Sequence, residues 1–100
     1  MLPPRLERLP LILLEDGTHT LLACDARSRL LGLAYLDPLP AGVRLLIPRC
    51  RSVHTFGMRF ALDLTFLDPD DQPLRVVRGV PAGRVLWCSR ATAVLEQPSS

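Results

Sequence analysis

The sequence predicts a mainly β fold, a small β-sandwich or partly open barrel of about seven mostly antiparallel strands with one short α-helix. Short apolar or alternating runs recur about every ten residues, and Gly, Pro and Asp separate them. A single stretch has apolar residues at helical spacing. With 100 residues, 48% of them apolar, the chain can fill one core. We therefore expect a single domain over residues 1–100, with residues 97–100 as a polar tail.

The first two predicted strands are Leu11–Leu14 and Thr18–Ala23. Asp16-Gly17 lies between them, and this dipeptide tolerates the positive φ of a type I′ turn. The two strands are therefore predicted to form a hairpin.

A helix is predicted to begin after Asp25, whose carboxylate can cap the first turn, and to run to about Tyr35. Its apolar face is predicted from helical spacing and comprises Ala26, Leu30, Leu33 and Ala34. Gly32 inside a helix costs roughly 1 kcal/mol relative to Ala. We therefore expect another group to approach its backbone closely.

Five further strands are predicted at Val43–Ile47, Phe60–Leu67, Leu74–Val77, Val85–Cys88 and Thr92–Glu96, with a break at Gly79–Gly83. The Arg49–Gly57 segment has no clean period and is predicted to be irregular. Phe60–Leu67 is predicted to be the central strand, with its even positions buried and Asp63 on the opposite face. Trp87 lies in a run that is apolar on both faces, which predicts a core position.

Composition excludes several classes of protein. The net charge is +2, every basic residue is Arg, and these residues are spread along the chain, so no nucleic-acid partner is predicted. No run reaches the roughly 20 apolar residues of a membrane span, and the segment after Arg8 is too short for a signal peptide. A cytoplasmic location is therefore expected. Three cysteines without C-x-x-C spacing predict neither disulfides nor a zinc site, so no metal or cofactor is expected.

Three motifs carry a resemblance to a known family. The stretch from Cys50 to Asp68 resembles the motif block of the domain of unknown function 192 family, also called UPF0127, in which Met-Arg/Lys precedes an apolar-Asp-apolar-apolar-Phe-apolar-Asp strand. Residues 29–33 (R-L-L-G-L) resemble its Arg-x-x-Gly-Leu helix, and residues 94–96 (V-L-E) resemble its closing strand. Two features differ: Gly57 replaces the Trp that many members place before the Met, and residues 97–100 lack the usual small-residue-Gly pair. The resemblance implies a mainly β fold but does not indicate an activity.

Asp63 is the acidic residue that local propensity least explains, because a carboxylate in mid-strand is costly to bury without a partner. As a structural residue, it would accept hydrogen bonds from backbone N–H groups or an Arg in the Arg49–Arg59 segment. As a functional residue, it would anchor a ligand or act as a general base. Arg59 lies about 13 Å away along a regular strand, so the two would mark the ends of a groove unless a bulge, for example at Gly57, brings them together.

His54 and Met58 complete the candidate ligand-binding set of His54, Met58, Arg59 and Asp63. A hydrogen-bonded structural role for His54 and a core position for Met58 are the simpler interpretations. Cys50, His54, Met58 and Cys88 could form a soft-metal set, but their spacing does not enforce one. No catalytic or metal-ligating residue is assigned. Glu96 is expected to pair with an Arg.

The favoured function is a non-enzymatic binding or accessory module for a small polar ligand or a peptide, with its partner unknown. The alternative is a small enzyme that uses His54 or Asp63 as general base and Arg59 as anion clamp. A third possibility is a structural subunit, which would present an exposed apolar patch.

Overall fold

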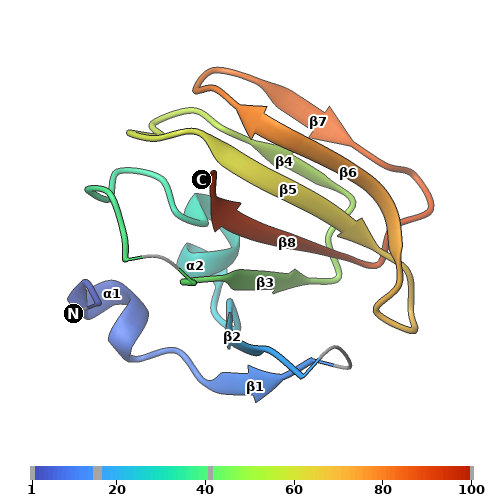
Figure 1. The fold of residues 1–100 in the computed structure, drawn as a ribbon, viewed down its shortest axis with the longest axis horizontal. Helices are drawn as coiled ribbons and strands as arrows, with labels where there is room; N and C mark the ends of the chain where they lie inside the picture. Colours follow the sequence, from blue (N-terminus) through green and yellow to red (C-terminus); the bar gives the residue numbers. More distant parts are fainter. Residues whose placement is uncertain (1, 15–16, 41, 100) are drawn as a thin grey trace.

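The computed structural model describes residues 2–14, 17–40 and 42–99. Within these residues the chain forms two short helices, α1 (Pro4–Glu7) and α2 (Ala26–Leu31), and eight strands (Figure 1). The strands are β1 (Leu11–Leu13), β2 (His19–Leu22), β3 (Leu45–Pro48), β4 (Ser52–His54), β5 (Leu62–Leu67), β6 (Pro73–Val80), β7 (Val85–Trp87) and β8 (Ala93–Pro98). The mainly β fold class predicted from the sequence is confirmed, with one more strand and one more helix than predicted.

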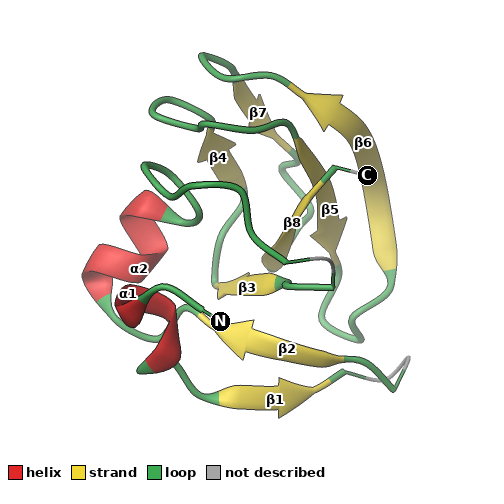
Figure 2. Ribbon diagram, turned by 60° about the vertical axis from the view of Figure 1, so that its left-hand side comes forward, coloured by secondary structure: helices red, strands yellow, loops and turns green. Residues whose placement is uncertain are grey.

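The strands form a six-stranded sheet, in the order β1-β2-β3-β8-β5-β6, and a two-stranded sheet of β4 and β7. Neighbours in the larger sheet are antiparallel except β2 and β3, which are parallel and are connected through α2. Both helices lie at one side of the molecule, beside β3 (Figure 2). Neither helix has the length or apolar content needed to cross a membrane.

The core lies between the six-stranded sheet, the β4–β7 sheet and the helical side. Its largest fully buried side chains include Leu6, Leu33, Leu45, Leu62, Leu64, Phe66 and Val94. A smaller cluster lies on the opposite face of the sheet and consists of Leu14, Leu46, Leu67, Ala93 and Leu95. Because side chains alternate along a strand, β5 contributes Leu64 to the main core and Leu67 to the smaller cluster.

The predicted hairpin of the first two strands is present, with Leu11 opposite Leu21. Asp16 of the predicted turn lies outside the described residues. α1 was not predicted; it is a single turn that begins at Pro4, a residue type favoured at the start of a helix.

The helix prediction was correct at its start and wrong at its end. Asp25 caps α2 by accepting a hydrogen bond from Ser28 N–H at 2.7 Å. The helix ends at Leu31 because Gly32 adopts a φ of 53°. Residues beyond Gly32 therefore leave the helical spacing. Leu30, predicted to be buried, is 68% exposed, and Ser28 is buried instead.

Four other predictions also need correction. The Arg49–Gly57 segment is not wholly irregular, because it contains β4. Gly79 lies inside β6 and not in a break. β8 lies between β3 and β5 and is therefore more central than β5. It extends through Pro98, so that Gln97 pairs with Asp63 within the sheet and does not belong to a tail.

Candidate functional site

A groove of about 480 Å³ lies on the face of β5, β6 and β8 that is turned away from the main core. Its wall and floor are formed by Leu14, Arg44, Asp63, Thr65, Leu67, Asp71, Gln72, Pro73, Val76, Arg78, Leu95 and Gln97. Asp63 is the one residue of the predicted ligand-binding set that lines it.

Strand pairing explains the composition of this groove. Asp63 is opposite Gln97 on β8, and Thr65 is opposite Leu95 on β8 and Val76 on β6. Since directly opposite residues share a face, these side chains all lie on one side of the sheet. The alternating pattern of β5 therefore fills the core with one set of side chains and lines the groove with the other.

A bulge in β6 supplies the hydrogen-bond donor for Asp63. Leu62 pairs with Val80 and Leu64 with Val77, so two residues of β6 lie opposite Asp63. One of them, Gly79, has a φ of 63° and donates its N–H to Asp63 Oδ1 at 2.9 Å. Glycine at positive φ is typical of such a bulge. The prediction that Asp63 accepts a backbone hydrogen bond was correct, but the donor lies on β6 and not in the Arg49–Arg59 segment.

The other oxygen of Asp63 faces a weaker partner. Asp63 is 6% exposed, and its Oδ2 lies 3.7 Å from Arg78 Nη1. This separation is an ion-pair distance that exceeds hydrogen-bond length. Oδ2 therefore accepts no hydrogen bond from the residues that the structure describes.

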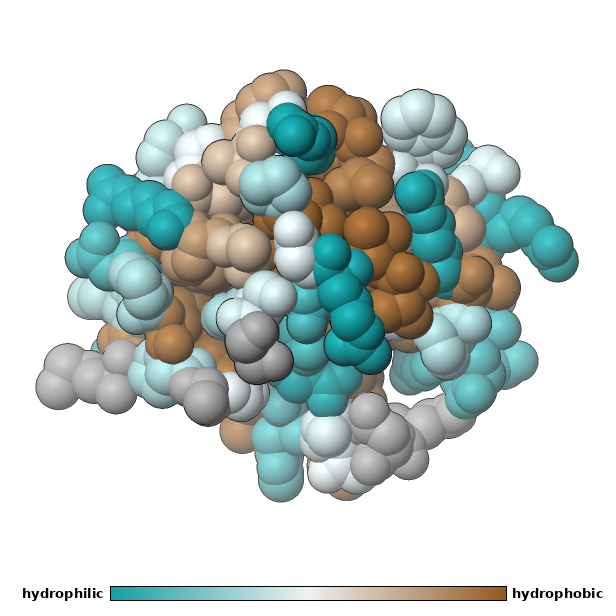
Figure 3. Space-filling model, turned by 45° about the horizontal axis from the view of Figure 1, so that its top comes forward, coloured by the Kyte–Doolittle hydropathy of each residue, from teal (hydrophilic) through white to brown (hydrophobic). Residues whose placement is uncertain are grey.

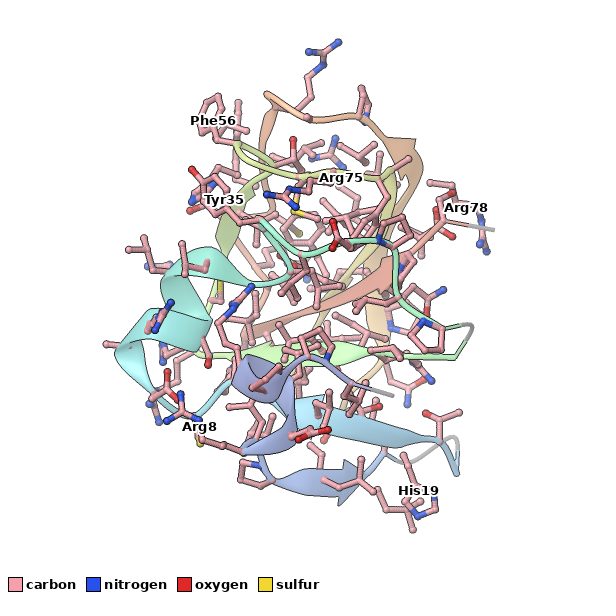
Figure 4. All side chains as sticks on the ribbon, turned by 90° about the vertical axis from the view of Figure 1, so that its left-hand side faces the viewer. Arg8, His19, Tyr35, Phe56, Arg75 and Arg78 are labelled. Atoms are coloured by element: carbon pink, nitrogen blue, oxygen red, sulfur yellow. The ribbon has the colours of Figure 1, made fainter. Side chains whose placement is uncertain are left out.

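Two arginines give the groove positive charge around this carboxylate. Arg44 is half-buried just before β3 and donates to Thr18 Oγ1. Arg78 is exposed on β6 and projects from the opposite side of the molecule to Phe56 and Tyr35 (Figure 4). The amide of Gln97 and the hydroxyl of Thr65 add neutral donors and acceptors. The groove can therefore contact a ligand that carries both charged and neutral polar groups.

The remaining members of the predicted set do not line this groove. Met58 is buried in the main core. Arg59 forms an exposed ion pair with Asp37 at 2.8 Å. His54 lies on β4, where its ring stacks on Phe56 with centroids 5.4 Å apart. The structure thus separates Asp63 from His54, Met58 and Arg59.

Glu96 forms a second polar centre, inside the core. Its pairing with Leu45 and Leu64 turns the side chain toward the main core, and burial raises its pKa to about 7. Oε1 accepts a hydrogen bond from Leu33 N–H at 3.2 Å. A Cβ on Gly32 would lie 2.5 Å from the same oxygen. The predicted close approach to Gly32 is therefore made by Glu96.

Arg5 is the arginine beside this carboxyl group, and its charge favours the ionised form of Glu96. Its guanidinium donates to Gly32 O at 2.8 Å and Ala34 O at 2.7 Å. The expected ion pair of Glu96 with an Arg is not formed within the described residues. Glu96 and Arg5 instead each hydrogen-bond to the chain after α2.

Cys50, the cysteine nearest to His54 in the sequence, lacks the features of an activated nucleophile. All three cysteines are free. Burial raises the pKa of Cys50, and its Sγ donates to Ser52 O at 3.1 Å, so the inert thiol form is favoured. In the described part of the chain, no group of three or more His, Cys, Asp or Glu residues could hold a metal ion.

Sequence reasoning missed most of the groove, including Arg44, Thr65, Arg78 and Gln97. These residues lie on or beside four different strands, and only the pairing of β3, β8, β5 and β6 brings them together. Local sequence carries no signal for that register.

Comparison with known proteins identifies the fold. No protein-family model and no curated protein matches the chain. A solved structure from Sinorhizobium meliloti 1021, described as a "putative transcription regulator", is similar with a TM-score of 0.72 and 18% identity, over 89% of this chain and 78% of that chain. A protein of unknown function from Novosphingobium aromaticivorans DSM 12444 is similar with a TM-score of 0.71 and 14% identity, over 99% of this chain and 88% of that one. At these identities the likeness shows a shared fold.

Proposed function

We propose that this protein is a binding module that holds a small polar ligand in the groove over Asp63. The proposal depends on the position and contacts of the Asp63 carboxylate. This carboxylate lies in the groove with one oxygen held by Gly79 N–H at 2.9 Å and the other 3.7 Å from Arg78. A ligand N–H group could supply the short charge-assisted hydrogen bond that Oδ2 lacks.

The charges around the groove define the ligand class. An ammonium or amide group of the ligand binds Asp63, and a carboxylate binds the guanidinium groups of Arg44 and Arg78, which suit planar anions. The volume of about 480 Å³ falls in the usual range for small-molecule sites, about 300–1,000 Å³. A small zwitterion, such as a free amino acid, meets these requirements.

We also infer membership of the UPF0127 family. The three segments that carry the resemblance support this inference by their contacts: Glu96 of the closing strand binds Leu33 of the Arg-x-x-Gly-Leu segment. Tyr35, just beyond that segment, donates its N–H to Gly57 O at 2.8 Å. Gly57 immediately precedes the Met-Arg pair of the motif block.

Titration of ¹⁵N-labelled protein with a panel of free zwitterionic amino acids, followed by NMR, tests the groove. Shifts should concentrate on groove residues of β5, β6 and β8. Asp63→Asn should weaken binding about 10- to 150-fold, the equivalent of a charge-assisted bond of roughly 1.5–3 kcal/mol. Asp37→Asn, an acid-to-amide change outside the groove, should leave affinity unchanged. Shifts elsewhere, equal affinity in both variants, or no binding by any panel member would contradict the proposal.

A further inference from the structure

The β4–β7 sheet carries an exposed face of aromatic and apolar side chains. Ser52 pairs with Trp87 and His54 with Val85, while Val53 and Leu86 between them turn toward the core. Phe56 extends this face by stacking on His54. The exposed fractions are 64% for Trp87, 54% for Val85 and 51% for Phe56. We call the set His54, Phe56, Val85 and Trp87 the aromatic face.

The core position predicted for Trp87 is therefore wrong. A two-stranded sheet buries one side against the domain, and no second layer covers the other side in the part of the chain that the structure describes. Tyr35 projects on the same side of the molecule as Phe56 (Figure 4), and it is 61% exposed. Large exposed apolar patches of this kind mark interaction sites.

An open strand edge lies beside the aromatic face. Among the described strands, β7 pairs only with β4 and β6 only with β5. The Trp87 carbonyl accepts a hydrogen bond from Arg75 Nη1 at 2.8 Å. In a larger sheet, a neighbouring strand would supply a backbone N–H group for this carbonyl. Between β6 and β7 lies a hollow of about 230 Å³ lined by residues 77–81 and 84–86. Unpaired edges of this kind accept an added strand from a partner.

The chain segments that form this surface carry basic residues and no acidic ones. Residues 38–62, which include β4, and residues 72–95, which include β6 and β7, each contain four Arg and no Asp or Glu. The backbone carbonyl of Arg51 accepts a hydrogen bond from Cys88 N–H at one end of the β4–β7 sheet. At the other end, the backbone N–H of Arg84 donates to Thr55 Oγ1. Neither guanidinium forms an ion pair within the described residues. Figure 3, which brings the β6–β7 side forward, shows apolar surface interrupted by hydrophilic side chains.

We propose that the aromatic face and the edge of β7 bind an extended segment of a partner protein that alternates apolar and acidic residues. The apolar side chains pack on Trp87 and Val85, the carboxylates pair with arginines such as Arg84, and the partner backbone bonds to the strand edge. This surface adjoins the groove over Asp63 at Arg78, which lines both the groove and the hollow between β6 and β7. A peptide fits better than a nucleic acid, because the open edge offers main-chain hydrogen bonds. The pI of about 8.7 also falls below the value of about 9 that marks nucleic-acid-binding domains.

Trp87 is the only Trp in the chain, so its fluorescence reports directly on this surface. The probe is a capped eight-residue peptide that alternates Glu with Val or Phe. The comparison probes are the same peptide with Lys in place of Glu and a single-stranded oligothymidylate of twelve nucleotides. Only the acidic peptide should shift the emission of Trp87, and its affinity should fall several-fold as salt is raised. Equal binding of the Lys peptide, tighter binding of the oligonucleotide, or no response to the acidic peptide would overturn the proposal.

Variants read by anisotropy of the labelled acidic peptide locate the site. Trp87→Ala should weaken binding more than tenfold and Arg84→Gln about threefold to tenfold. Leu30→Ala and Arg8→Gln, which change an exposed Leu and an exposed Arg elsewhere, should not alter it. Equal losses in the control variants would place binding elsewhere. Sedimentation that showed a dimer dissociated by Trp87→Ala would assign the face to a second copy of the chain and refute the peptide proposal.

Discussion

Replacing Asp63 by asparagine and by alanine separates the two contacts of its carboxylate. The hydrogen bond from Gly79 N–H, in the β6 bulge, to Oδ1 has the ordinary length of 2.9 Å, and hydrogen bonds to a charged group contribute about 1.5–3 kcal/mol. The ion pair with Arg78 is longer, and the Arg78 side chain is 75% exposed. It should therefore contribute at most about 1 kcal/mol.

Asn keeps a neutral acceptor for Gly79 N–H, so Asp63→Asn should lower the free energy of unfolding by about 1 kcal/mol. Ala leaves that N–H without an acceptor in a partly buried position, so Asp63→Ala should cost about 2–3 kcal/mol. Each kcal/mol corresponds to a fall of about 4–8 °C in melting temperature for a domain of this size.

Urea denaturation followed by far-UV circular dichroism measures both losses. Fluorescence is less suitable, because Trp87 is already 64% exposed in the folded state. Asp37→Asn, which breaks an exposed ion pair with Arg59, is the matched control and should cost less than about 1 kcal/mol. If both Asp63 variants stayed within about 0.5 kcal/mol of the parent, the structural reasoning would be refuted and the carboxylate would be left to ligand binding alone.

Three further outcomes are expected. Leu64 is fully buried between β8 and β6, so Leu64→Ala should lower the free energy of unfolding by about 2–5 kcal/mol; a loss below about 0.5 kcal/mol would contradict its core position. Burial raises the pKa of Glu96 from 4.5 to about 7, so the folded protein retains a proton that the unfolded chain releases. The stability that this retained proton contributes is fully present below pH 4.5 and is lost as the pH rises through about 7. Denaturation at pH 5 and pH 8 should show this loss in the parent and not in Glu96→Gln. Gly32→Ala should destabilise more than Gly83→Ala, because both residues have positive φ but only at Gly32 would a Cβ meet Glu96; equal losses would show that this contact is not tight.

Local signals predicted the local structure well. Asp25 caps the helix because its carboxylate and Ser28 N–H are only three residues apart. The hairpin of the first two strands and the buried even positions of β5 likewise depend on alternation within a few residues. Gly32 was flagged by its cost within a helix, and the structure shows that it also ends the helix, which displaced the predicted apolar face.

Features that depend on pairing between distant strands were not predictable. The groove needs Asp63, Gln97 and Val76 in register across three strands. The donor to Asp63 needs a bulge at Gly79, which local composition suggested to be a loop. Trp87 shows the same limit, because alternation cannot reveal that its sheet has only two strands and leaves one face open.

The position of β8 has a consequence for how the chain acquires its fold. β8 is the last of the eight described strands, yet it lies between β3 and β5 and supplies the pairing that joins them. β5 and β6 can form a hairpin as soon as they are synthesised, but β3 must wait until residues 93–98 are made. The end of β8 follows the end of β5 by 31 residues, so at about 5–20 residues per second β5 waits about 1.5–6 s for its second partner, and β3 waits longer. During that time two apolar strand edges are exposed to other chains. Loss of the final strand would leave the sheet in two separate halves, so premature termination in this region should yield an aggregating product.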